Sequence, residues 1–219
     1  MTEIKLIEIG EEIHSDNKKT AADVRSILTK SGTFLLNLMA SPGAGKTSLI
    51  MNTLSGLSNQ TRALVIEADI DSLVDAEKIV QAGARAVQIH TGGFCHVNAG
   101  MIMKTVHSLN IDEIDLLILE NVGNLICPAQ VDTGAHANAM ILSVPEGDDK
   151  PLKYPLMFRS CEVLVVNKID YLKMEDFDME KLKDRVWKLN PDMKIFELSC
   201  KTGEGLDPWV GWLRNRIRL

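Results

Sequence analysis

Short apolar runs rich in β-forming residues alternate with helical patterns from about residue 33 to the end of the chain. Most of the runs are unbroken rather than alternately polar, as is typical of strands that are covered on both faces. Because a helix has to carry the chain back between two parallel neighbours, this alternation predicts a mostly parallel sheet flanked by helices. Strands are expected at residues 34–39, 63–68, 86–90, 115–120, 139–144, 163–166 and 195–198.

Helical periodicity fills the intervals between these runs. The predicted helices span about 17–30, 46–57, 72–82, 98–109, 175–189 and 205–217, and the last carries a core-facing apolar stripe. Residues 145–155 are rich in proline and charge and are predicted to form a loop. A chain of 219 residues fits one α/β domain spanning 1–219, because cores usually divide only beyond roughly 250 residues. Residues 1–32 are expected to form a strand/helix extension packed on that domain.

Composition excludes several classes of protein. The formal charge of −6 argues against a nucleic-acid binder, whose surface normally carries a basic excess. No apolar run approaches the roughly 20 residues needed to cross a bilayer, and the first residues lack the basic start and apolar stretch of a signal peptide. We therefore expect a cytoplasmic protein with no membrane or nucleic-acid partner, in which the four cysteines are free thiols or metal ligands.

The segment ASPGAGKT at residues 40–47 matches the phosphate-binding pattern G-x-x-x-x-G-K-[ST], except that alanine replaces the first glycine. It follows a predicted strand and opens a predicted helix, the context that makes the match credible. Backbone amides around Gly43, Ala44 and Gly45 would cradle phosphate, and Lys46 would neutralise the β- and γ-phosphates. The hydroxyl of Thr47 would hold Mg²⁺. Ser48, the next residue, is also predicted to bind nucleotide. These residues predict a three-layer P-loop NTPase fold.

A second motif, N-K-x-D, follows the strand at 163–166 and predicts which base is bound. The carboxylate of Asp170 can accept hydrogen bonds from the ring N–H and the amino group of guanine, a pair of donors that adenine lacks. Asn167 and Lys168 complete the motif. After the next strand, the segment Ser199, Cys200 and Lys201 resembles the guanine-contacting S-A-K segment of GTPases. Together with the phosphate loop, the two segments predict a GTP and GDP site.

Carboxylates close two further strands, where loops of a parallel sheet meet the ligand. Asp69 and Glu120 are the predicted catalytic partners of Lys46, and with Thr47 they are the predicted Mg²⁺ ligands. Gly123 would allow a switch segment to approach the γ-phosphate. Asp71 and Asp75 are weaker candidates, because charged residues that enter a helix often serve only as caps.

Two thiols and an imidazole are expected to converge at the same sheet edge. Cys95 and His96 follow one strand, and Cys127 follows another just beyond Gly123. Such ligands suit Zn²⁺ or Ni²⁺, and the missing fourth ligand would come from water or, as we favour, from a two-fold dimer. From these residues alone, the alternative stays open that both cysteines are small buried hydrophobic groups. Cys161 has no partner at a suitable spacing and is expected to be structural.

The segments ASPGAGKT, EADIDSLVDA, GGFCH, ENVGNLICPA, NKID and SCKTGEG, in this order, resemble the hydrogenase maturation GTPase family HypB. The resemblance implies a dimeric P-loop GTPase that assists nickel insertion into [NiFe] hydrogenase, with metal ligands Cys95, His96 and Cys127 at the subunit interface. It also implies two partners, a hydrogenase large subunit precursor and a nickel-binding accessory protein of the HypA type. Lys153 would contact nucleotide across the dimer.

Some features distinguish this chain from members and relatives of that family. No cysteine precedes residue 95 and the N-terminal region has no His-rich stretch, so high-capacity nickel storage is not expected. The related urease accessory GTPase, which shares the architecture, is the first alternative, although it would carry a Cys-Pro-His motif, whereas Ala129 follows Cys127 and Pro128 here. A P-loop kinase or ligase that uses ATP, and a regulator that binds GTP without turnover, are the remaining alternatives.

Overall fold

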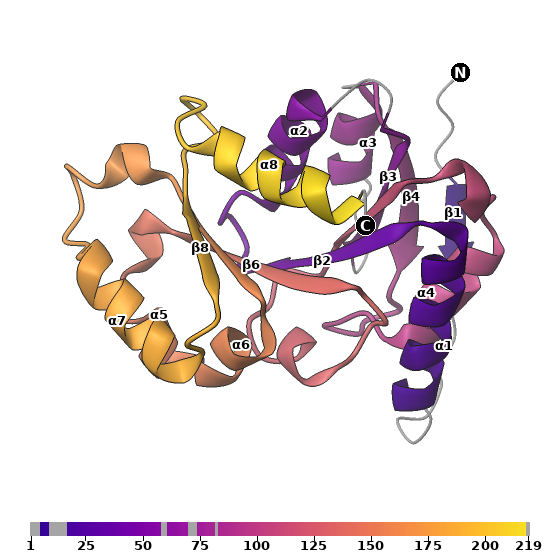
Figure 1. Cartoon of the computed structure of the whole chain (residues 1–219), viewed down its shortest axis with the longest axis horizontal. Coiled ribbons are helices and arrows are strands. Elements are labelled where there is room, and N and C mark those ends of the chain that lie inside the picture. Colours follow the sequence, from indigo (N-terminus) through magenta and orange to yellow (C-terminus); the bar gives the residue numbers. More distant parts are fainter. Residues whose placement is uncertain (1–4, 9–16, 58–60, 70–73, 82, 218–219) are drawn as a thin grey trace.

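A computed structural model describes residues 5–8, 17–57, 61–69, 74–81 and 83–217. Its centre is a parallel sheet of eight strands in the order β1-β4-β3-β5-β2-β6-β7-β8 (Figure 1). The strands are Lys5–Glu8 (β1), Phe34–Ala40 (β2), Ala63–Asp69 (β3), Arg85–His90 (β4), Leu116–Glu120 (β5), Ala137–Ser143 (β6), Val163–Asn167 (β7) and Lys194–Glu197 (β8). The predicted parallel α/β fold is confirmed.

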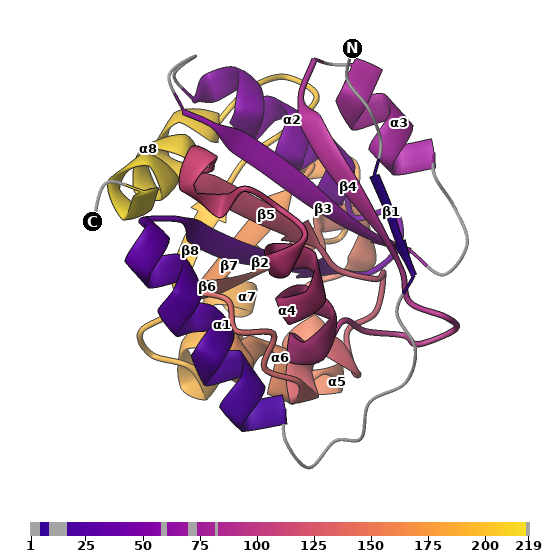
Figure 2. The ribbon, with the colours of Figure 1, turned by 90° about the vertical axis from the view of Figure 1, so that its right-hand side faces the viewer.

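Helices cover both faces of the sheet (Figure 2). One face packs against α2 (Lys46–Gly56), α3 (Val74–Gln81) and α8 (Leu206–Ile217). The other packs against α1 (Asn17–Ser31), α4 (Ala99–His107), α6 (Pro155–Ser160) and α7 (Met179–Leu189). Short helices occupy the connections: η2 (Ile111–Glu113), η3 (Pro128–Gln130), η4 (Val144–Glu146), α5 (Lys150–Lys153) and η5 (Ile169–Tyr171). Among the described residues, no helix is long and apolar enough to cross a membrane.

Strand β2 shows why the central runs of the sequence are unbroken. All seven of its residues are buried. Successive side chains of a strand point to opposite faces, so Leu36 and Leu38 pack under α2 and α8, while Leu35 and Met39 pack on the other side. A central strand between two helical layers therefore needs apolar residues at nearly every position.

The prediction of a loop at residues 145–155 is wrong. The segment contains η4 and α5 and leads into α6, and Pro145, Pro151 and Pro155 all lie in the first turn of one of these helices. Proline is well suited to that position, because its missing N–H has no partner there in any case and its φ is already helical. The prolines here begin helices rather than interrupt them.

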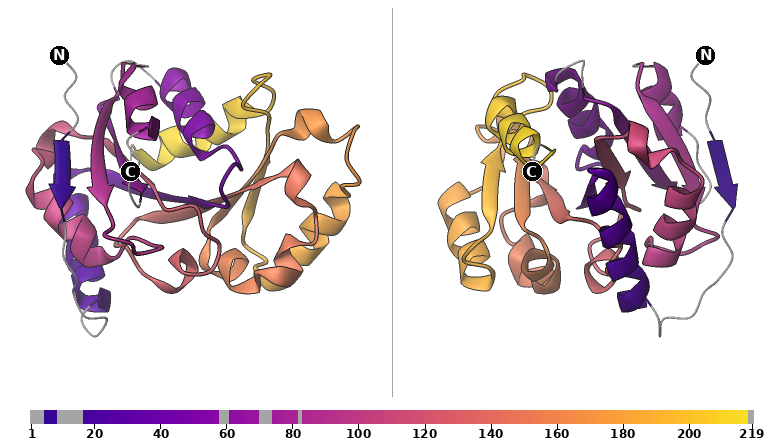
Figure 3. Two further views of the ribbon diagram at one scale, coloured as in Figure 1. Left: turned by 180° about the vertical axis from the view of Figure 1, so that it is seen from behind. Right: turned by 45° about the vertical axis from the view of Figure 1, so that its right-hand side comes forward.

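The N-terminal elements β1 and α1 both pack on other elements of the fold. Figure 3 shows β1 at the outer edge of the sheet, where it pairs with β4, and α1 standing beside α4. The side chain of Asn17 ties α1 to its surroundings, because Oδ1 accepts from the amide of Ala99 at 2.9 Å and Nδ2 donates to the carbonyl of Asp132 at 2.8 Å. Arg25 on the same helix forms an ion pair with Asp132 at 2.9 Å.

Candidate nucleotide and metal site

The phosphate loop lies between β2 and α2, at the carboxyl edge of the sheet. Gly45 precedes the first residue of α2 and has φ 103°, a conformation that side chains disfavour. A Cβ at this position would also lie 2.5 Å from Nδ2 of Asn167. Glycine is therefore required both for the turn and for close contact with the base-reading loop. The N-terminal amides of α2 open onto this edge and form a ready anion site.

Lys46 and Thr47 meet Glu120 at the start of α2. Thr47 Oγ1 donates to Glu120 Oε1 at 3.1 Å, and Lys46 Nζ lies 4.0 Å from the same oxygen. Glu120 is only 4% exposed, so its carboxylate interacts in a setting where water screens little. A hydroxyl and a carboxylate oxygen at this distance are hard ligands of the kind that Mg²⁺ prefers.

The neighbouring strand β3 brings a second carboxylate to the same position. Glu67 pairs in register with Glu120 and is also 4% exposed. Sequence reasoning chose Asp69 instead, which is the last residue of β3 but whose side chain lies outside the described part of the structure. Asp71 likewise lies outside the described residues. Glu67 was missed because a single polar residue in an apolar run gives no functional signal by itself.

Gly123 lies directly against the phosphate loop. A Cβ at Gly123 would be 3.0 Å from the ring of Pro42 and 3.3 Å from its backbone nitrogen. The loop that leaves Glu120 therefore passes over the loop that is predicted to hold phosphate, and any larger residue at this point would separate them.

The base-reading motif lines a cavity of about 200 Å³, together with Gly45 and Ser48 from the phosphate loop and helix. The remaining lining residues come from two loops: Asn167, Lys168, Asp170, Tyr171, Cys200 and Lys201. The cavity thus brings together the phosphate loop, the N-K-x-D segment and the segment after β8, the three segments that the sequence predicted to bind nucleotide.

Asn167 holds these loops together. It is 1% exposed, its Nδ2 donates to the carbonyl of Ala44 at 3.0 Å, and its Oδ1 accepts from the amides of Lys168 and Cys200 at 2.7 and 3.1 Å. Lys168 has φ 62° and is the one non-glycine residue with positive φ in the described ranges. Its Nζ donates to the carbonyl of Gly43 at 2.8 Å. The N-K pair is thus engaged with the phosphate loop.

Asp170 is held in place by the segment after β8. Ser199 Oγ donates to Asp170 Oδ1 at 2.7 Å and accepts from the amides of Lys201 and Thr202. Lys201 Nζ lies 6.0 Å from the centre of the Tyr171 ring. Burial raises the pKa of Cys200 to about 11, so this thiol is neutral at physiological pH.

Cys95, His96 and Cys127 form the one metal-compatible cluster found among the described residues. One ligand atom from each lies within 4.8 Å of the others. Cys95 Sγ is 3.8 Å from His96 Nδ1, and both cysteines are partly buried. The pKa of Cys95 is raised, mainly by a hydrogen bond with the Cys127 thiol and to a smaller extent by burial. By contrast, Cys161 is fully buried, and desolvation raises its pKa to about 12, as suits an inert core thiol.

Asn121 is a second residue that sequence reasoning missed. It follows Glu120, is 1% exposed, and accepts through Oδ1 from the amides of Val97 and Val122 at 3.3 and 2.9 Å. Val97 is the residue after His96, so this side chain joins the Glu120 loop to the Cys95 loop. An asparagine after a buried strand was the available signal.

Lys153 lies away from the cavity of its own chain. It is on α5, its side chain is 58% exposed, and it pairs with Asp149 one turn earlier.

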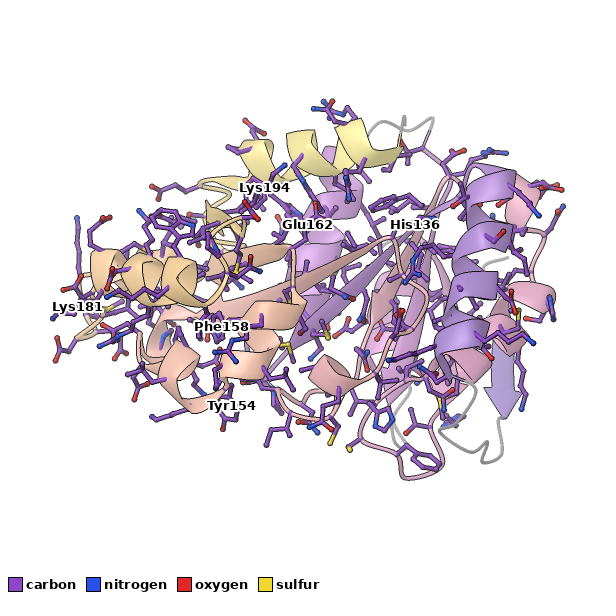
Figure 4. The ribbon with its side chains drawn as sticks, turned by 60° about the horizontal axis from the view of Figure 1, so that its bottom comes forward. His136, Tyr154, Phe158, Glu162, Lys181 and Lys194 are labelled. Carbon is purple, nitrogen blue, oxygen red and sulfur yellow. The ribbon has the colours of Figure 1, made fainter. Side chains whose placement is uncertain are left out.

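A second cavity, of about 280 Å³, lies at the amino-terminal ends of β2 and β6, at the edge of the sheet opposite the phosphate loop. Its lining includes Phe34, His136 and Arg216. Figure 4 labels His136. None of the predicted site residues lines this second cavity.

Comparison with known proteins supports the resemblance noted from the motifs. The family model "CobW/HypB/UreG, nucleotide-binding domain" matches residues 34–197. Hydrogenase maturation factor HypB of Escherichia coli (strain K12) is 38% identical over 216 residues, which cover 99% of this chain and 74% of that protein.

Two solved structures share the fold closely. The crystal structure of HypB from Helicobacter pylori in complex with nickel has a TM-score of 0.88 and 36% identity, covering 93% of this chain and 96% of that one. HypB from Archaeoglobus fulgidus has a TM-score of 0.86 and 37% identity, covering 93% and 99%. The chain belongs to the hydrogenase maturation factor HypB family, within the CobW/HypB/UreG nucleotide-binding group.

Proposed function

We propose that this chain is a cytoplasmic GTP-hydrolysing switch that assists nickel insertion into [NiFe] hydrogenase. One observation carries the proposal: the loop that begins at Glu120, beside Lys46 and Thr47, ends at Cys127 in the thiol–imidazole cluster. The names of the relatives, and the nickel in the Helicobacter pylori structure, support the choice of process. A nucleotide-dependent movement at Glu120 would act directly on a metal ligand.

The nucleotide end has the groups that phosphoryl transfer requires. Lys46 would neutralise the β- and γ-phosphates, and Thr47 with Glu120 would hold Mg²⁺, joined by Asp69 as originally expected. Bound Mg²⁺ supplies charge neutralisation between the phosphates. The mutual pairing of Lys46, Thr47 and Glu120 supports these roles, because each group is already directed to the same point. Slow hydrolysis, typical of such switches without a partner, is expected.

The base pocket supports GTP over ATP. Ser199 holds one oxygen of Asp170, and Asn167 fixes the loops on either side of it. A carboxylate oriented in this way would bind both guanine donors, and with adenine it would stay unpaired. Guanine selectivity separates the proposal from the kinase or ligase alternative.

The metal end offers three ligands suited to Zn²⁺ or Ni²⁺. Two thiols and one imidazole within 4.8 Å of each other match the donor chemistry of such ions, and deprotonation of the thiols would accompany binding. Four-coordinate sites need one more ligand. Water or a second copy of the chain would supply it, and the ion is cargo in this proposal rather than a permanent structural group.

A homodimer forms part of the proposal. Leu152 and Leu156 are 66% and 46% exposed on α5 and α6, and Ile126, beside Cys127, is 55% exposed. Exposed apolar side chains of this size commonly mark interaction sites. A dimer formed through α5 and α6 would also carry Lys153 to the partner chain. The hydrogenase large subunit precursor and a nickel-binding accessory protein of the HypA type are the proposed further partners.

Replacing one metal ligand tests the proposal. In Cys127→Ala we expect a lower metal stoichiometry in the presence of GTP and of GDP, with nucleotide affinity within about twofold of wild type. Plasma mass spectrometry of dialysed protein and titration with nucleotide measure the two quantities. Cys161→Ala, which removes a core thiol remote from the cluster, is the control. Unchanged metal stoichiometry in Cys127→Ala would refute the assignment.

A further inference from the structure

Asn121 lies between Glu120 at the phosphate loop and the loop that carries Cys95 and His96. Its backbone amide donates to the carbonyl of Leu38 at 3.0 Å, which fixes it beside β2 directly after Glu120. Its Oδ1 accepts from Val122 on its own loop and from Val97 on the loop that carries Cys95 and His96. The side chain is 1% exposed, so water does not compete for these contacts.

The orientation of the Asn121 amide is fixed by its neighbours. Because Oδ1 receives two backbone N–H groups, Nδ2 is left as the donor, and it donates to Oδ1 of Asn37 at 3.1 Å. Asn37 Nδ2 then donates to Oδ1 of Asn138 at 2.9 Å, and Asn138 Nδ2 donates to the carbonyl of Ser160 at 3.3 Å. Backbone amides at one end and a backbone carbonyl at the other allow a single direction for the chain of hydrogen bonds.

This chain of hydrogen bonds connects the loop that carries Cys95 and His96 with helix α6. It runs from Asn121, the residue after β5, through Asn37 in β2 and Asn138 in β6 to the carbonyl of Ser160, the last residue of α6. Helix α6 also carries Leu156 of the proposed dimer surface. The pairing of Asn37 with Asn138 in register keeps the amides adjacent across the sheet.

We infer that Asn121 is the positioning residue through which the nucleotide state of the phosphate loop reaches the Cys95–His96 loop. This inference rests on the proposed function. A shift of Glu120 on nucleotide binding would move the following residue, and the contact between Asn121 Oδ1 and the Val97 amide would transmit that shift to Cys95 and His96, which precede Val97. Asn121 touches neither nucleotide nor metal in this role.

Asn98 provides a matched control within the same loop. Its Oδ1 accepts from the amide of Met101 at 2.9 Å and caps α4, only three residues from Cys95. Asn98→Ala therefore removes a loop asparagine and weakens a helix end without touching the Glu120 segment. Asn121→Ala removes the link itself, and Asn121→Asp keeps an acceptor oxygen for the amides of Val97 and Val122.

The test is titration of full-length protein with Zn²⁺ or Ni²⁺ when it is loaded with GDP and when it is loaded with a non-hydrolysable GTP analogue. We expect metal Kd values of wild type and Asn98→Ala to differ between the nucleotide states by about fivefold or more, a common size for coupling between sites. In Asn121→Ala the two Kd values should agree within about twofold, while nucleotide affinity and metal stoichiometry are retained. Asn121→Asp should recover a measurable difference.

The outcomes separate this inference from the proposed function. If wild type shows the difference and Asn121→Ala keeps it, Asn121 does not carry the coupling, and the switch itself stands. If the wild-type Kd values are equal in both states, the switch fails, and the inference fails with it.

A measurement on the wild-type protein covers the case in which Asn121→Ala does not fold. Hydrogen exchange followed by NMR should show the Val97 and Val122 amides changing protection together between the GDP and GTP-analogue forms, because both donate to one oxygen. Protection at Val97 that is the same in both forms would overturn the inference.

Discussion

At the residue scale, the members of the N-K-x-D motif have different roles: Asn167 and Lys168 hold loops together, whereas Asp170 is the proposed base ligand. Asn167 uses its amide to join the backbone of three segments and is nearly inaccessible, and Lys168 reaches back to the phosphate loop. Asp170 is the member of the motif that lines the cavity with a carboxylate. Base selectivity should therefore follow Asp170, whereas changes at Asn167 should affect every nucleotide.

Exchanging Asp170 for its amide tests this division. Asp170→Asn presents a donor where guanine also donates, so we expect GTP affinity to fall at least about 100-fold. Xanthosine triphosphate, which has a carbonyl in place of the amino group, should gain affinity in the same variant. Competition titrations with GTP, ATP and xanthosine triphosphate measure the change, and the exposed Asp176→Asn is the control. Wild-type GTP affinity in Asp170→Asn would contradict the guanine assignment.

His136 predicts a pH dependence of stability. The amide of Leu35 donates to Nδ1 of its ring, and Nε2 contacts Thr29. Burial is the main cause that lowers the pKa of the imidazole, and the positive charges of Arg25 and Arg216 lower it further. The unfolded chain, with an ordinary pKa of about 6.5, then binds the proton more readily than the folded one. The stabilising contribution is complete above about pH 6.5 and is lost as the pH falls toward the lowered folded pKa.

We expect the free energy of unfolding to decrease less between pH 7.5 and 5.5 in His136→Asn than in wild type. Asparagine retains an acceptor for the Leu35 amide but does not titrate. Urea unfolding at several pH values measures the slope, and the exposed His107→Asn is the control. Equal slopes in wild type and His136→Asn would contradict a neutral His136 in the fold.

At the level of secondary-structure elements, α1 packs so closely against the connection before β6 that this connection needs a glycine at the point of contact. Gly134 has φ 82°, and a Cβ there would lie 2.7 Å from the side chain of Val24 and 2.9 Å from the carbonyl of Ala21. The connection before β6 thus approaches the backbone of the N-terminal helix. The Asn17 and Arg25 contacts add polar links at the same junction.

Gly134→Ala should lower the free energy of unfolding by roughly 2–5 kcal/mol, the sum of positive-φ strain and overpacking. Gly83→Ala provides the control, since Gly83 has φ 85° with nothing within 4 Å of the added Cβ, and it should lose only about 1–2 kcal/mol. Chemical denaturation of both variants measures the difference. Equal losses of unfolding free energy in the two variants would mean that α1 can move away from residue 134 without an energetic penalty.

For the molecule as a whole, one edge of the sheet gathers the segments that we propose to bind nucleotide and metal. The groups proposed for phosphate, magnesium and base come from the ends of β2, β5, β7 and β8 and the loops after them, and the proposed sulfur ligands come from the loops after β4 and β5. Leu152 on α5 and Leu156 on α6 lie outside this group and are exposed. Assembly through these two side chains would bring a second copy of the chain against α5 and α6.

Leu152→Glu combined with Leu156→Glu should prevent the nucleotide-dependent dimer, because two charges would be buried without partners. Sedimentation velocity with the GTP analogue should show monomer for the double variant and dimer for wild type. Trp187→Glu on α7 changes another exposed apolar residue and should leave the dimer intact. A double variant that still dimerises would exclude this surface.

The alternation of strands and helices from about residue 33 and the main motifs of both candidate sites could be predicted from the sequence. Unbroken apolar runs, glycine before Lys46, and the N-K-x-D segment are local features, and each reports a local requirement of burial, turn or ligand. Helix boundaries were less exact: α7 begins at Met179 rather than near 175, because the Asp178 side chain caps it by accepting from Lys181.

Which residues lie next to one another could be seen only in the folded structure. Strand order brings Glu67 beside Glu120 and aligns Asn37, Asn121 and Asn138, although each appears in the sequence only as an isolated polar residue. It also places Asn167 against the phosphate loop, 123 residues earlier in the chain. Local propensity acts over a few residues, whereas these contacts depend on how strands distant in sequence are ordered in one sheet.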